Sequence, residues 1–260
     1  MPPSASTTAT TTASPTPTPD ASTAPDPMFA QMYSATTAYL WAIPQLTDRE
    51  MTFLCVVADV CQGSLGPAFE LHVRTGLAHG VSLADIRALL RLIAYDSGYH
   101  SALDALGALD TLHALGRLAD LEPEASLPQD ALLPEELTST GPGAAPSPLP
   151  EPVRAQLREL DPHFAEYFDL QSRMRTPTGP GTLSIRERAF TTMSIDVHYQ
   201  TLDETFRIHT NRALGAGASP DDVRAVLRFI AQFGATRVWR AWTALNAHLA
   251  TLPNASNVDS

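Results

Sequence analysis

Apolar residues recur at three- and four-residue spacing through most of the chain beyond residue 25, which is the periodicity of one face of an α-helix. No alternating apolar and polar pattern of useful length is present, so no β-strand is expected. The sequence therefore predicts an all-α fold. The predicted helices cover 51–59, 68–79, 86–93 and 101–115, and further along 205–215, 223–230 and 237–249.

Capping residues indicate where these helices begin and end. Thr47 is followed three residues later by Glu50, the capping-box pattern in which each side chain bonds the backbone amide of the other residue. A glycine directly after an apolar helical pattern is a typical helix end. Similar signals recur at Asp26, Ser82, Asp161, Ser184 and Ser219 as caps, and at Gly80 and Gly217 as ends.

The chain repeats itself. Shifted by about 137 residues without a gap, it matches itself at many apolar positions and also at polar ones, among them Asp59 with Asp196 and His72 with His209. Two units of this size can each form a core, so either two similar domains or one intimately packed pair is expected. The predicted division is a disordered tail (1–25), a first repeat (26–121), a linker (122–150), a second repeat (151–252) and a C-terminal tail (253–260).

Composition excludes several functions. A net charge of −11 argues against nucleic-acid binding, and no apolar stretch is long enough to span a membrane. All 17 basic residues are arginine, which excludes a Schiff-base lysine, a lysine anchor for pyridoxal phosphate and a Walker A loop. Cys55 and Cys61 fit neither a disulfide framework nor a zinc knuckle, so a cytoplasmic protein is expected. The expected partner is a small-molecule substrate, with neither nucleic acid nor a membrane.

Two sequence motifs, each present in both repeats, resemble motifs of the carboxymuconolactone decarboxylase family, which includes the alkylhydroperoxidase D-like proteins. They are Phe-Glu-Leu-His-Val-Arg at 69–74 with Gly-Val-Ser-Leu-Ala-Asp-Ile-Arg at 80–87, and their counterparts at 206–209 and 217–224. The resemblance implies two tandem helical repeats of that family, and a homo-oligomer in which three chains form a pseudo-hexameric ring. The Cys-x-x-Cys of the peroxidase members is absent, because those positions hold Leu65 and Ala68, and Leu202 and Thr205. The cysteine-poor branch that remains uses acid–base groups and no cofactor.

His72 is the first candidate catalytic residue, since an imidazole can move a proton to or from carbon near neutral pH. Arg74 could bind a substrate carboxylate, and Asp96 and Glu70 could assist as acids or bases. Each has a structural alternative: a core histidine, a surface ion pair for Arg74, and a solvent-facing helix end for Asp96. Because three of these four have no like counterpart in the second repeat, the first repeat is expected to hold the working pocket.

The second repeat offers His209, His198 and Glu204 as further candidates, with the retained fold as the rival explanation for His209. The spacing from Glu204 to His209 is poor for a helical metal site, so no metal is expected. Arg228, in an apolar helix like its counterpart Arg91, would need an anion, which Asp59 or Asp196 could supply.

Two classes of function stay open. The first is a cofactor-independent lyase or isomerase, decarboxylase-like or cyclase-like, acting by acid–base chemistry on a small lactone acid or an enolisable polyketide-like substrate. The second is a non-catalytic oligomeric binding or scaffold protein. A pocket that gathers His72, Arg74 and Asp96 would favour the enzyme.

Overall fold

The computed structural model describes residues 26–121, 132–175 and 183–252, so the expected tails and part of the expected linker lie outside it. Every regular element in these ranges is helical, which confirms the all-α prediction. The first repeat contains α1 (Pro27–Trp41), α2 (Asp48–Gln62), α3 (Pro67–Ala78), α4 (Leu83–Ser97) and α5 (Tyr99–Ala114). The second contains α8 (Pro162–Met174), α9 (Ile185–Tyr199), α10 (Glu204–Gly215), α11 (Pro220–Ile230), the 3₁₀ turn η1 (Ala231–Phe233) and α12 (Ala235–Leu249).

The predicted caps are present. Thr47 Oγ1 accepts a bond from the Glu50 amide while the Glu50 carboxylate accepts one from the Thr47 amide, and Ser184 with Glu187 repeats this box at the start of α9. Ser82 and Ser219 form boxes of the same kind with aspartates. Gly80 has φ of 80° and Gly217 has φ of 89°, a backbone conformation that favours glycine after a helix. Local sequence therefore determines most helix boundaries.

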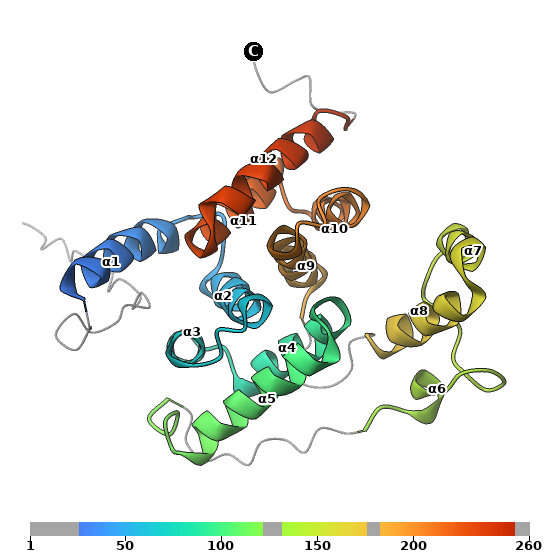
Figure 1. Cartoon of the computed structure of the whole chain (residues 1–260), viewed down its shortest axis with the longest axis horizontal. Helices are drawn as coiled ribbons and strands as arrows, with labels where there is room; N and C mark the ends of the chain where they lie inside the picture. Colours follow the sequence, from blue (N-terminus) through green and yellow to red (C-terminus); the bar gives the residue numbers. More distant parts are fainter. Residues whose placement is uncertain (1–25, 122–131, 176–182, 253–260) are drawn as a thin grey trace, which may run out of the picture.

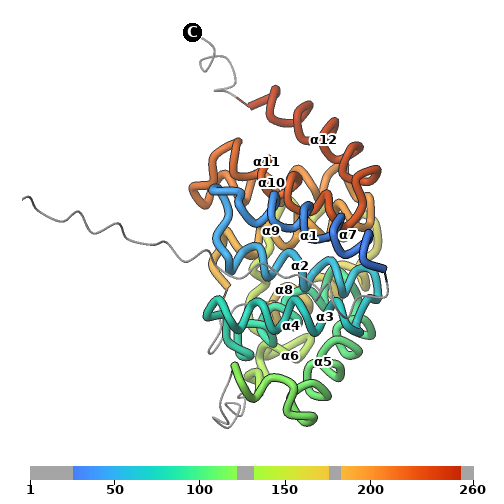
Figure 2. Tube along the Cα trace, turned by 90° about the vertical axis from the view of Figure 1, so that its left-hand side faces the viewer, coloured from blue at the N-terminus to red at the C-terminus, as the bar shows by residue number. Residues whose placement is uncertain are grey.

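Helices α2 and α9 lie side by side at the centre of the molecule (Figures 1 and 2). Their first turns are joined by ion pairs between Arg49 and Glu187 and between Arg186 and Glu50. In their last turns, Tyr199 and Cys61 lie close enough for each to affect the pKa of the other. The two helices therefore run in the same direction.

The repeats form one intimately packed pair rather than two separate domains. Leu40, Trp41 and Leu54 belong to a core made mostly of second-repeat residues. Leu183 and Ile195 belong in turn to the core of the first repeat. Each repeat thus completes the core of the other, and groups from both can meet at one site.

Two short helices precede α8: α6 (Glu135–Thr138) and α7 (Glu151–Leu160). Together with α8 they form a group at one side of the molecule (Figure 1). No residue from 132 to 150 is buried, but the segment is fastened to α8. Arg173 donates to the carbonyl of Ser139, and the Ser147 hydroxyl bonds Asp169. The described part of the expected linker is therefore a folded cover on α8.

Candidate functional site

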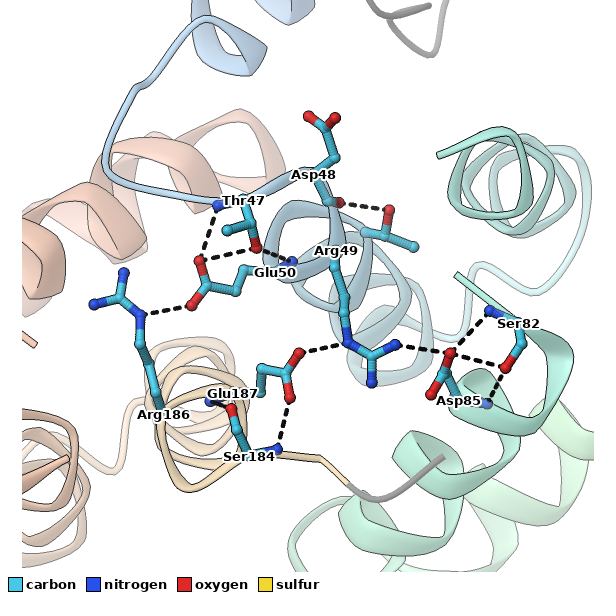
Figure 3. Close-up of polar contacts among 10 residues, drawn as sticks. Thr47, Asp48, Arg49, Glu50, Ser82, Asp85, Ser184, Arg186 and Glu187 are labelled. Carbon is cyan, nitrogen blue, oxygen red and sulfur yellow. Dashed lines mark hydrogen bonds and ion pairs between the residues drawn. The ribbon is translucent and has the colours of Figure 1, made fainter. Parts of the chain in front are cut away.

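The matched arginines and acidic residues form a reciprocal ion-pair network (Figure 3). Arg49 lies 2.5 Å from Glu187 of the other repeat and 2.7 Å from Asp85 of its own. Its counterpart Arg186 lies 2.7 Å from Glu50 and also pairs with an aspartate of its own repeat, at 3.0 Å. Because each glutamate also closes a capping box, the network joins the helix starts of both repeats. These matched charged residues therefore hold the first turns of α2 and α9 together.

The matched histidines each bond a matched aspartate. In what we term the first pair, His72 Nδ1 on α3 lies 2.7 Å from Asp59 Oδ2 on α2, and each residue is only 4% exposed. In the second pair, His209 Nδ1 on α10 lies 2.6 Å from Asp196 Oδ2 on α9. A carboxylate at Nδ1 fixes the orientation of an imidazole and leaves Nε2 as its second functional nitrogen.

The first pair lies among apolar and weakly polar side chains. The ring of Phe233, from η1 of the second repeat, meets His72 edge-on at 6.0 Å between centroids, and Cys55 lies close enough to affect the imidazole. Burial disfavours the imidazolium, but the sulfur of Cys55 and the carboxylate of Asp59 together raise the pKa of His72 well above its ordinary value. Burial also raises the pKa of Asp59. The first pair therefore holds a proton tightly in a closed environment.

The second pair is held more firmly. The Thr201 hydroxyl donates to Asp196 Oδ1 at 2.7 Å, so both carboxylate oxygens of Asp196 have a hydrogen-bond partner. The corresponding residue in the first repeat, Ser64, bonds Asp59 through the backbone, its amide donating to the Asp59 carbonyl at 2.8 Å. Hydrogen bonds at both carboxylate oxygens therefore fix the orientation of Asp196 toward His209.

The surroundings of the second pair are charged. Asp96, at the end of α4, lies 2.7 Å from Arg175, whose guanidinium covers the ring of Tyr95. Burial raises the pKa of Asp96, against the lowering effect of Arg175 and His209. Partial desolvation, with the like charge of Arg175, lowers the pKa of Arg212. Asp96 of the first repeat therefore lies among arginines of the second repeat and near enough to His209 for the charge of that histidine to affect it.

Arg188 belongs to the same group. It donates to the backbone carbonyl of Arg175 at 3.0 Å, and no ion pair of Arg188 is found within the described ranges. Desolvation, followed by the charges of Arg175 and Arg212, lowers its pKa. Three guanidinium groups close enough to affect one another, with one nearby carboxylate, create a positive field suited to an anion.

The structure does not bring the four first-repeat candidates together. Arg74 bonds both carboxylate oxygens of Asp120, at 2.8 and 3.1 Å, on the exposed surface. Glu70 pairs with Arg117 in the same surface group. His72 lies apart from them, paired with Asp59, because it occupies the buried face of α3. The expected pocket of His72 with Arg74, Glu70 and Asp96 is thus not formed.

The remaining candidates are also dispersed. His198 is buried, its Nδ1 donates to the carbonyl of Ser194 at 2.8 Å, and burial lowers its pKa. Its ring lies 6.3 Å from Phe233, on the side of the first pair. Glu204 is the exposed first residue of α10. Burial raises the pKa of Cys61 to about 12, so its thiol is a poor nucleophile at neutral pH.

Sequence reasoning missed the partners of the histidines. Asp59 and Asp196 were expected to neutralise Arg91 or Arg228, but Arg228 pairs with Asp221 and Arg91 is exposed. The available signal was the equal spacing of aspartate and histidine in both repeats. For Arg175, by contrast, nothing in the sequence indicated that it would belong to the site, because its partner Asp96 is distant in sequence.

The sequence and the fold can be compared with those of known proteins. No family model matches the chain, and no curated protein matches it significantly. Among solved structures it is similar to a "putative gamma-carboxymuconolactone decarboxylase subunit" from Burkholderia xenovorans LB400. The identity is 20%, the TM-score is 0.49, and the likeness covers 86% of this chain and 87% of that one.

Within the described ranges, no group of three or more His, Cys, Asp or Glu side chains is arranged to hold a metal ion. None of the described helices combines the length and apolar character needed to cross a membrane.

Proposed function

We propose that the protein is a cofactor-independent acid–base enzyme, a lyase or isomerase, that acts on a small anionic substrate at the second pair. One observation carries the proposal: His209 is oriented by Asp196, and its charge reaches Asp96, the carboxylate that pairs with Arg175. This combination supplies a proton carrier, a second acid or base and an anion-binding field at one place. The first pair has the proton carrier but lacks charged neighbours of that kind.

The geometry supports a proton-transfer mechanism. Asp196 accepts the Nδ1 proton of His209, so Nε2 can remove a proton from an acidic carbon of the substrate. The electron pair left by that C–H bond moves onto the adjacent carbonyl oxygen, forming an enolate beside the arginines. Returning the proton to a different carbon completes an isomerisation. In a decarboxylation, His209 enters the reaction as the imidazolium. The C–CO₂ bond breaks, its electron pair forms the enolate, CO₂ leaves, and the enolate takes its proton from that imidazolium, which becomes neutral.

The arginines and Asp96 have distinct roles in this proposal. Arg212 and Arg188 would bind the substrate carboxylate or the enolate, since a planar guanidinium matches a carboxylate with two parallel bonds. Arg175 holds Asp96, and burial raises the pKa of Asp96, which favours its use as an acid. The family resemblance of the sequence motifs supports a lactone acid such as a carboxymuconolactone as substrate, with an enolisable polyketide-like acid as the alternative.

The test is to incubate the protein with γ-carboxymuconolactone and with a panel of enolisable lactone and β-keto acids in D₂O. Deuterium incorporation measured by NMR reports proton transfer at carbon, and released CO₂ reports decarboxylation. We expect turnover of at least one acid without added metal or cofactor. Turnover that is unaffected by His209→Ala would contradict the assignment of the second pair.

A scaffold role is the second candidate, favoured by an apolar surface. Helix α1 exposes Met28, Phe29, Met32 and Tyr39, although such side chains are usually covered in an assembled protein. We propose that this face joins copies of the chain, with a trimer as the expected assembly. Light scattering should give the mass of three chains, and Met32→Glu should reduce it. A wild-type monomer at micromolar concentration would contradict the assembly.

A further inference from the structure

A cavity of about 460 Å³ lies between α8 and the segment that covers it. Its wall comes from residues 140–147 of the cover, from α7 and from one face of α8, the group seen at one side of Figure 1. Ala144, Pro146 and Ala165 provide an apolar surface, while Arg154, Arg158 and Arg173 provide three guanidinium groups. The cavity is large enough for a small organic molecule.

Arg173 is the unusual member of this wall. It is only 6% exposed, and its one described hydrogen bond is to the backbone carbonyl of Ser139 at 2.8 Å. No carboxylate in the part of the chain that the structure describes pairs with it, and its Nε has no hydrogen-bond partner there. A buried guanidinium without an anion is costly, because burial removes the water that would otherwise solvate its charge.

The other two arginines of the cavity are already neutralised. Arg154 lies 3.2 Å from Asp169 and 3.1 Å from Glu151, and Arg158 also pairs with Glu151. The wall also contains the carboxylates of Glu166 and Asp169, but among the described residues neither forms an ion pair with Arg173. Arg173 is therefore the guanidinium of this wall that lacks a carboxylate partner in the described ranges. That arrangement suits a ligand with a single anionic group and an apolar body that can lie against the alanine and proline surface.

We propose that this cavity binds a small organic carboxylate, with the carboxylate on the Arg173 guanidinium. The planar fork of arginine bonds a carboxylate through two parallel hydrogen bonds. The apolar wall favours an organic carboxylate over inorganic phosphate, which has no apolar part to bury. The cavity lies between the cover, α7 and α8, whereas the second Asp–His pair lies on α9 and α10, so this site stands or fails independently of the proposed catalysis.

The experiment measures binding of benzoate and of inorganic phosphate to the full chain by isothermal titration calorimetry at fixed ionic strength. Arg173→Met removes the charge while keeping a side chain of similar length. Ala144→Trp fills the cavity from the cover without changing Arg173. Arg158→Met is the matched control, since this arginine also lines the cavity but is already paired. The melting temperature of each variant without ligand reports whether it is folded.

We expect benzoate to bind the wild type and to raise its melting temperature. Binding should weaken about tenfold or more in Arg173→Met, as expected for loss of a charged hydrogen bond, and be lost in Ala144→Trp, but change less than about threefold in Arg158→Met. Equal losses in the two arginine variants would overturn the assignment to Arg173. Phosphate binding without benzoate binding would overturn the carboxylate class, and absence of binding by either anion would overturn the site.

Discussion

The first and second Asp–His pairs have almost the same internal geometry, with Nδ1 to carboxylate distances of 2.7 and 2.6 Å. They differ in what the opposite repeat places beside them. Phe233 of the second repeat lies edge-on to His72, whereas its counterpart Asp96 of the first repeat lies near enough to His209 for the charge of that histidine to lower the pKa of Asp96. The environment of each histidine is thus decided by a residue from the other repeat. A duplicated pair can diverge in function without any change in the pair itself.

The largest expected effect separates the two histidines by activity. If His209 carries the proton, His209→Ala should lower kcat on the acid identified above by about 10²–10⁴. His72→Ala should keep kcat within a few-fold but lower stability, because it leaves Asp59 buried without its partner. Steady-state kinetics and thermal melting of both variants give the two readouts. The opposite ranking of kcat would assign catalysis to the first pair.

The second prediction compares the halves of the ion-pair network. Arg186→Met should lower the free energy of unfolding by about 3 kcal/mol, because Glu50 is only 4% exposed and would lose its cation. Arg49→Met should cost less, about 1–2 kcal/mol, since Glu187 and Asp85 retain more contact with water. Urea denaturation of both variants measures the difference. Equal costs would show that burial of the glutamate does not set the contribution of the arginine.

The third prediction concerns how α2 packs on α3. A Cβ at Gly76 would lie 2.4 Å from Thr52 Cγ2, whereas the corresponding residues of the second repeat are Ala213 and Ala189. Gly76→Ala should therefore destabilise the protein by about 1–2 kcal/mol, although alanine is the better helix former. Adding Thr52→Ala should recover most of this loss, because it reproduces the second-repeat pair. A double-mutant cycle tests the coupling, and purely additive effects would contradict it.

The smallest effect is on the pH dependence of stability. Because the pKa of His72 is raised in the folded protein, its contribution is complete below the unfolded value near 6.5 and is lost as pH rises through the folded value. The free energy of unfolding should thus fall more steeply between pH 7 and 9 in the wild type than in His72→Gln. Urea denaturation across this range measures both slopes. A variant slope as steep as that of the wild type would assign the loss to other groups.

The sequence by itself determined the helices and their boundaries. Thr47 with Glu50, Ser184 with Glu187, and the glycines at 80 and 217 act on backbone groups a few residues away, so their effect can be predicted without knowing the rest of the fold. The repeated spacing also made His72 and His209 candidates for function. A polar residue that recurs at the same place in an apolar segment is not needed for packing of the core.

Only the tertiary structure decided which charged groups meet. Arg74 and Glu70 lie close to His72 in sequence, yet they pair on the surface with Asp120 and Arg117. Asp96, expected beside His72, pairs instead with Arg175 and is affected by the charge of His209, both from the other repeat. The physical reason is that helix caps depend on neighbours along the chain, whereas ion pairs between helices depend on how the two repeats complete each other's cores, which no local pattern encodes.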